Sequence, residues 1–97
     1  MNYSIQEISE IVVPIAQSYG VSKMGLFGSY ARGEANENSD IDIFIEKGNL
    51  RSLIQYFSLV SELEDKLGCH VDVVTTNIED KEFIEIIMKE GVLLYEQ

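Results

Sequence analysis

Apolar residues in the first part of the chain recur at the three- and four-residue spacing of an amphipathic helix. Ser4 and Glu7 form the Ser-x-x-Glu capping box that typically opens a helix, and the apolar positions continue to about Gly20. Pro14 lies inside this segment, where a proline removes one backbone hydrogen bond and crowds the preceding turn at a cost of roughly 3 kcal/mol. We therefore predict a helix to about Gly20 with a kink or a break at Pro14.

Three further segments carry the pattern of β-strands. Residues 23–27 are apolar-rich and end at Gly28, which indicates a buried strand that leads into a turn, and residues 34–39 are polar loop. From residue 40 the chain alternates strictly: one face holds three isoleucines, and the other holds Asp40, Asp42, Phe44 and Glu46. Residues 71–74 alternate in the same way, with Val71 and Val73 on one face and Asp72 and Val74 on the other.

Two more helices complete the pattern. Asn49 is predicted to cap a helix that ends at Gly68, with an apolar stripe of Leu50, Leu53, Ile54, Phe57, Val60, Leu63 and Leu67. A last helix is predicted over about 79–90, before Gly91 and a short apolar tail at 92–95, and its inward side chains are Phe83, Ile84, Ile87 and Met88. This order of elements predicts an α/β (α+β) fold, a small mixed β-sheet flanked by helices in a single domain over residues 1–97.

Composition narrows the classes of function. Seven basic against 17 acidic residues give a net charge of −10, which repels nucleic-acid backbones and anionic membranes, so direct nucleic-acid binding is disfavoured and any phosphate chemistry needs a cation. Cys69 is the only cysteine, and no apolar run approaches the ~18 residues of a membrane span, so we predict a cytoplasmic protein. A chain of 97 residues also leaves little room for a deep two-substrate cleft, so we expect one ligand to be met at the surface.

The acidic positions suggest a metal site. The side chains of Asp40 and Asp42 leave the same face of the strand, with Cα atoms about 6.5–7 Å apart, and two such charges repel unless a cation lies between them. Mg²⁺ suits this arrangement because it takes carboxylate oxygens and keeps other positions for water and phosphate. Asp72 would complete the set if its strand lay beside residues 40–46 with its polar face turned the same way. The alternative is a half-exposed sheet whose aspartates simply point to water.

A glycine-serine turn stands upstream of these acids. Gly28 permits a positive φ and close backbone approach, and successive N–H groups at a helix start can hold an anion. Residues 28–42, GSYARGEANENSDID, resemble the G-S-x-A-R-G…S-D-x-D signature of the minimal nucleotidyltransferase (MNT) family, within the DNA polymerase β-like nucleotidyltransferase superfamily. The likeness continues to Asp72, and the order of elements and the length resemble the family across nearly the whole chain.

The resemblance implies a nucleotidyltransferase-like fold and a role for each motif residue. Gly28 and Ser29 would hold the β- and γ-phosphates of ATP, and the carboxylates of Asp40 and Asp42 would bind two Mg²⁺ ions. Asp72 would complete the metal site and lie nearest the attacking hydroxyl, as ligand or as general base. Arg32 resembles the motif arginine, which either meets phosphate or forms a salt bridge with Glu34 or another acid.

The resemblance also implies a partner. MNT-family proteins resemble the antitoxin half of paired systems whose other half is a HEPN-domain ribonuclease toxin, and members transfer AMP to a tyrosine of that toxin. The expected activity is therefore Mg²⁺-dependent protein adenylylation. Two alternatives stay open: a non-catalytic subunit that neutralises its partner by contact, and the catalytic subunit of a small-molecule nucleotidyltransferase. A homo-oligomer is compatible with so small a sheet.

Other polar residues have simpler interpretations. We expect Ser39 to make a turn or cap bond that orients Asp40, and Cys69 to be a small core residue. His70 has no histidine or cysteine partner at ligand spacing, which favours a structural or surface role. Lys47 and Arg51 follow the acidic strand and are interpreted as solvated charges or, alternatively, as neutralisers of the triphosphate.

Overall fold

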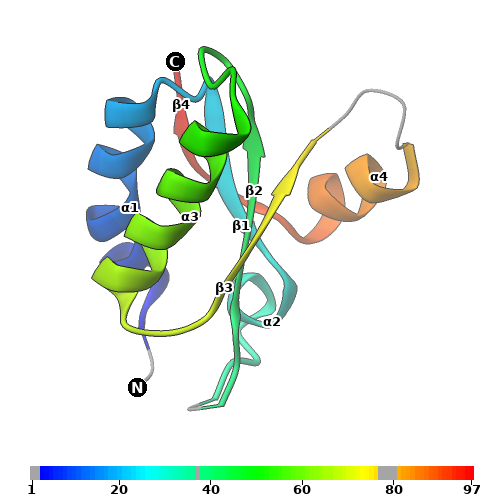
Figure 1. The fold of residues 1–97 in the computed structure, drawn as a ribbon. Coiled ribbons are helices and arrows are strands. Elements are labelled where there is room, and N and C mark those ends of the chain that lie inside the picture. The colour runs from blue at the N-terminus through cyan, green and yellow to red at the C-terminus, as the bar shows by residue number, and fades with distance from the viewer. Residues whose placement is uncertain (1–2, 37, 77–80) are drawn as a thin grey trace.

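The chain folds into alternating helices and strands. The computed structural model describes residues 3–36, 38–76 and 81–97. Its elements, in chain order, are α1 (Ile5–Tyr19), β1 (Lys23–Phe27), α2 (Gly28–Arg32), β2 (Ile41–Glu46), α3 (Leu53–Leu67), β3 (Val71–Thr75), α4 (Lys81–Glu90) and β4 (Val92–Glu96). Figure 1 shows the sheet between two groups of helices, with α1 and α3 on one side and α2 and α4 on the other.

The strands form one mixed sheet in the order β3-β2-β1-β4, which confirms the predicted fold class. β1 is antiparallel to both β2 and β4, while β2 is parallel to β3. Residues 92–95 were predicted only as a short apolar tail. In the structure they belong to a strand, β4, which pairs with the free edge of β1. The strand was not predicted because its pairing partner is distant in sequence and the apolar segment is too short to show a strand pattern by itself.

The main core lies between the sheet and the pair α1 and α3. The three isoleucines of β2 are fully buried on this side, as their alternation predicts. They pack with buried residues of the two helices and of β1, among them Ile8, Val12, Leu59, Leu63, Met24 and Leu26. The core therefore occupies one face of the sheet, and the acidic positions of β2 are left on the other.

Helix α1 forms as its sequence pattern predicts, except at its proline. The capping box is present: the hydroxyl of Ser4 accepts from the backbone N–H of Glu7, and the Glu7 carboxylate accepts from the N–H of Ser4. The helix continues through Pro14, so of the kink or break predicted there the break is absent. Pro14 and Glu10 are both exposed, so the Glu10 carbonyl that loses its helical partner lies on the solvent side, where water can bind it.

The other helices differ from prediction at their ends and faces. Ser52, not Asn49, is the N-cap of α3, and its hydroxyl accepts from the N–H of Gln55 at 3.1 Å. Within α3 only the later part of the predicted stripe is buried, and the helix begins three residues later than predicted, with Leu53, Ile54 and Phe57 exposed. Met88 of α4 was expected inward and is 80% exposed. The predicted start of α4 at residue 79 lies outside the described residues.

Candidate active site

Three aspartates meet on the sheet face opposite the main core. Asp42 of β2 pairs in register with Asp72 of β3, so both side chains leave the same face of two neighbouring strands. Carboxylate oxygens of Asp40 and Asp72 lie within 4.8 Å of each other and of a ring nitrogen of His70. The strand pairing that the sequence left as an assumption is therefore present, and it brings the predicted acids together.

The glycine-serine turn closes over these acids from the next strand. Phe27 is the register partner of Asp42, and Gly28 follows it with φ +73°, the left-handed region that favours glycine. A Cβ on Gly28 would collide with the Oδ2 atom of Asp42. Only glycine lets the backbone approach the carboxylate this closely, so the turn and the acids form one site.

The electrostatics of the site favour a bound cation. Partial burial of the Asp42 carboxyl raises its pKa, and the negative charge of Asp72 raises it further, while the charge of Arg32 acts in the opposite direction. A carboxyl with this surrounding is stabilised in its ionised form by a positive ion. The hard oxygens of the three aspartates are the ligand type that Mg²⁺ prefers, so the donor set fits that metal.

His70 is closer to the site than the sequence suggested. Its Nε2 lies 2.9 Å from Oδ1 of Asp72, and its Nδ1 lies 3.1 Å from Oε2 of Glu64. The hydrogen bond with Asp72 raises the pKa of His70 above its usual value. The ring is exposed, in keeping with the predicted surface role, but its contact with Asp72 was missed. The available signal was the two-residue spacing from His70 to Asp72, which puts both on one strand face.

Arg32 forms the salt bridge that was one of its two interpretations. Its Nε lies 3.2 Å from Oε2 of Glu34, and its Nη1 lies 3.3 Å from Oε2 of Glu90. The second contact ties α2 to α4. The rings of Phe27 and Phe83 make another link between the end of β1 and α4, in an edge-to-face contact with centroids 5.3 Å apart. Helix α4 is thereby fixed beside the glycine-serine turn.

The remaining candidates are distributed around the sheet. Ser39 makes the predicted turn bond, because its Oγ accepts from the N–H of Asn36 at 2.9 Å. Cys69 packs against the core, and burial raises the pKa of its thiol. Lys47 and Arg51 lie past the far end of β2 and line a separate hollow that none of the three aspartates lines. The structure does not bring them to the acids.

A mixed four-stranded sheet that gathers three aspartates beside a glycine-serine turn defines a nucleotidyltransferase domain. Residues 10–97 match the family model described as Polymerase beta, Nucleotidyltransferase, and the chain belongs to this family. None of the helices over the described residues combines the length and the apolar character that a membrane span requires.

A named relative and two solved structures are similar to this chain. The protein adenylyltransferase MntA of Thermococcus cleftensis is 33% identical over 93 residues, which cover 92% of this chain and 94% of the relative. A crystal structure of a toxin–antitoxin with AMP-PNP has the same fold, with a TM-score of 0.78 and 23% identity over 92% of this chain and 73% of that one. So does a structure of a tri-AMPylated Shewanella oneidensis HEPN toxin in complex with an MNT antitoxin, with a TM-score of 0.72 and 20% identity over 96% and 73%.

Proposed function

We propose that residues 1–97 form a single, cytoplasmic nucleotidyltransferase domain that transfers AMP from ATP to a tyrosine hydroxyl of a HEPN-type ribonuclease toxin and so acts as its antitoxin. The observation that carries the proposal is the convergence of Asp40, Asp42 and Asp72 beside Gly28. The name of the Thermococcus relative and the contents of the two similar structures support the class of reaction and of partner.

Each site residue has a proposed role. The carboxylates of Asp40, Asp42 and Asp72 would hold two Mg²⁺ ions, which would neutralise the negative charge of the triphosphate and of the leaving pyrophosphate. The backbone at Gly28 and Ser29, with the Ser29 hydroxyl, holds the β- and γ-phosphates. Arg32 adds positive charge at the same end of the sheet. A cation is needed because the chain carries a net charge of −10, and a triphosphate alone would be repelled.

The proposed reaction is an in-line displacement at the α-phosphorus. The acceptor oxygen attacks that phosphorus, the bond from the phosphorus to the pyrophosphate oxygen breaks, and the proton of the hydroxyl passes to Asp72 or to water. The products are an AMP ester of the acceptor and pyrophosphate. The position of Asp72 on β3, across β2 from the glycine-serine turn, supports this role.

Labelling with α-³²P-ATP tests the proposal. The chain is incubated with Mg²⁺ and a HEPN-domain protein from its own source organism, beside the Asp40→Asn and Asp42→Asn variants. Transfer of label to the HEPN protein should fall by at least about a hundredfold in each variant, because each loses a negatively charged metal ligand. EDTA should abolish the labelling. Asp65→Asn is the matched control, since Asp65 is an exposed carboxylate of α3 away from the site.

Other results would assign a different function. Variants that neutralise the toxin without labelling it would identify an antitoxin that acts by contact alone. Label recovered on a small molecule and never on protein would identify a small-molecule nucleotidyltransferase. Label that persists in Asp42→Asn would refute the metal site itself.

A further inference from the structure

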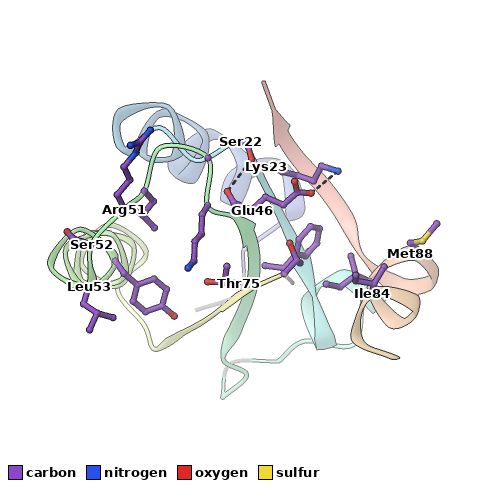
Figure 2. A pocket seen from close by; sticks show the side chains of 16 residues that line it. Ser22, Lys23, Glu46, Arg51, Ser52, Leu53, Thr75, Ile84 and Met88 are labelled. Atoms are coloured by element: carbon purple, nitrogen blue, oxygen red, sulfur yellow. Dashed lines mark hydrogen bonds and ion pairs between the residues drawn. The ribbon is translucent and has the colours of Figure 1, made fainter. Parts of the chain in front are cut away.

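A concave surface lies at the end of the sheet away from the aspartates. This hollow, of about 1090 Å³, lies between the start of α3, the far ends of β2 and β3, and α4. Figure 2 shows Leu53 of α3, Thr75 of β3, and Ile84 and Met88 of α4 around it. Phe44 belongs to its lining and stands two positions after Asp42 on the same strand face, so the hollow begins one side-chain row from the proposed metal site.

The surface of this hollow is apolar and unusually exposed. Leu53 is 72% exposed and Met88 is 80% exposed, on two helices that border the hollow from different sides. Phe44, Tyr56 and Ile87 extend the apolar lining between them. Large apolar side chains that gather around a depression and remain in water are typical of a surface that a protein partner covers.

The charge of the hollow is opposite to that of the whole chain. Among the described residues, its lining contains three basic residues and one acidic residue, in a protein with a net charge of −10. The acidic one, Glu46, is paired with Lys23 at 3.2 Å. Within the described part of the chain, the side chains of Lys47 and Arg51 form no ion pair. The hollow therefore offers two positive charges beside an apolar floor, which suits a segment with apolar and acidic side chains.

The in-line geometry of the proposed reaction also brings the acceptor to the β3 edge of the sheet, which borders the hollow. In an in-line displacement the attacking oxygen arrives opposite the leaving group. With pyrophosphate at Gly28 and Ser29 over β1, the acceptor must come from the side of β3, which is an edge strand. Thr75, which lines the hollow, lies three residues beyond Asp72 on that strand, so it is roughly 10 Å away at an extended rise and its side chain leaves the opposite face, while Phe44 lines the hollow on the face of the aspartates. A peptide of about three extended residues spans this distance.

We propose that this hollow is the docking site for the acceptor protein, and that it takes an apolar segment with acidic residues about three positions from the residue that receives AMP. The inference rests on the proposed function. A nucleoside is the other candidate occupant, but its base carries no negative charge for Lys47 and Arg51 when its phosphates lie at Gly28. The acceptor segment uses both the apolar floor and the two cations.

The test separates binding of acceptor from binding of nucleotide. Leu53→Ser removes an apolar contact of the hollow, and Ile54→Ser is its matched control, because Ile54 is 79% exposed on the same helix and does not line the hollow. Arg51→Glu reverses a charge at the rim, and Lys66→Glu makes the same change in the last turn of α3. The readouts are KM for the HEPN protein in the labelling assay and the affinity for Mg²⁺ with AMP-PNP by calorimetry.

We expect Leu53→Ser and Arg51→Glu each to raise KM for the HEPN protein by about tenfold, the size typical of a buried interface contact, and to leave nucleotide affinity unchanged. Ile54→Ser and Lys66→Glu should change neither quantity. Weaker nucleotide affinity with an unchanged KM for the acceptor would assign the hollow to the nucleoside and overturn the inference, as would no change at all. A wild-type chain that labels no protein would overturn the proposed function, and this inference with it.

Discussion

At the scale of single residues, the charge of Asp42 has opposite effects on stability and on the proposed metal site. Asp42 is partly buried beside Asp72, and both its burial and its neighbour's charge raise its pKa. The same position is held against the backbone of Gly28, where no larger residue fits. An ionised Asp42 without a metal is thus a cost to the fold, and we infer that this cost is retained because the site needs the charge.

Replacement of Asp42 by asparagine should therefore stabilise the metal-free protein. Because the folded state binds the Asp42 proton more tightly than the unfolded chain, ionised Asp42 lowers stability above its raised pKa, and the penalty disappears as the pH falls below the ordinary carboxyl pKa. An asparagine side chain cannot ionise, so Asp42→Asn should melt higher at pH 7.5, and the difference should shrink near pH 4. A gain of about 0.5 kcal/mol corresponds to roughly 2–4 °C in a domain of this size.

Circular dichroism melts in EDTA measure this effect, with Asp65→Asn as the exposed control. A lower melting temperature for Asp42→Asn at pH 7.5 would contradict the assigned electrostatics of the site.

At the scale of elements, two helices deviate from their sequence patterns for different reasons. Helix α1 keeps a proline in its interior, because the lost hydrogen bond falls on the exposed side. Helix α3 has an apolar stripe over its whole length, yet only Leu59, Leu63 and Leu67 are buried in it. Its first turns extend beyond the core and carry the exposed leucine that borders the hollow.

Pro14→Ala should stabilise the protein by about 1–2 kcal/mol. Alanine restores the backbone N–H and removes the clash with the preceding turn, a gain of up to about 3 kcal/mol, from which the greater freedom of the unfolded chain subtracts about 0.4–1 kcal/mol. Urea denaturation measures the change, and Gln17→Ala, at another exposed position of α1, should have little effect. A destabilised Pro14→Ala would show that the helix is already adapted to the proline.

At the scale of the whole molecule, the last strand closes the fold. β4 pairs with β1 at one edge of the sheet, so the end of the chain lies beside residues 23–27. Figure 1 shows the C-terminal strand next to β1 and α1. Lys23 of β1 also bridges the carboxylates of Glu46 and Glu96 on its two neighbours, at 3.2 and 3.3 Å. The sheet is therefore complete only when the end of the chain has returned to β1.

Adjacent leucines of β4 test this role. Leu94 packs against the core, whereas Leu93 is 51% exposed. We expect Leu94→Asp to reduce the free energy of unfolding by about 2 kcal/mol or more, because it puts a carboxylate without a partner against the core. Leu93→Asp should cost less than about 1 kcal/mol. Equal effects of the two variants in urea denaturation would show that the strand does not contribute to the core in this way.

Much of the molecule follows from local patterns. The capping box of α1, the glycines that end α1 and α3, and the alternation of β2 each depend on residues close in sequence, and each forms as predicted. Gly28 and Asp42 also occupy one site, because they lie on or next to the antiparallel strands β1 and β2, which only a short segment separates in sequence. The strand character of residues 92–96 and the true start of α3 were not recovered, since the first depends on β1, which is distant in sequence, and the second on where the helix leaves the core. The contact of His70 with Asp72 is local and was missed although the two-residue spacing indicated it.

The amino-acid sequence alone indicated which residues are candidates for the chemistry, because the residue types and the spacing of Gly28, Ser29, Asp40 and Asp42 are local properties. Only the tertiary structure decided that Asp72 stands opposite Asp42, since the parallel pairing of β2 and β3 joins segments about thirty residues apart. It also decided which apolar side chains are buried. An apolar stripe in the sequence indicates that one helix face favours burial, but tertiary packing determines how much of that face is covered.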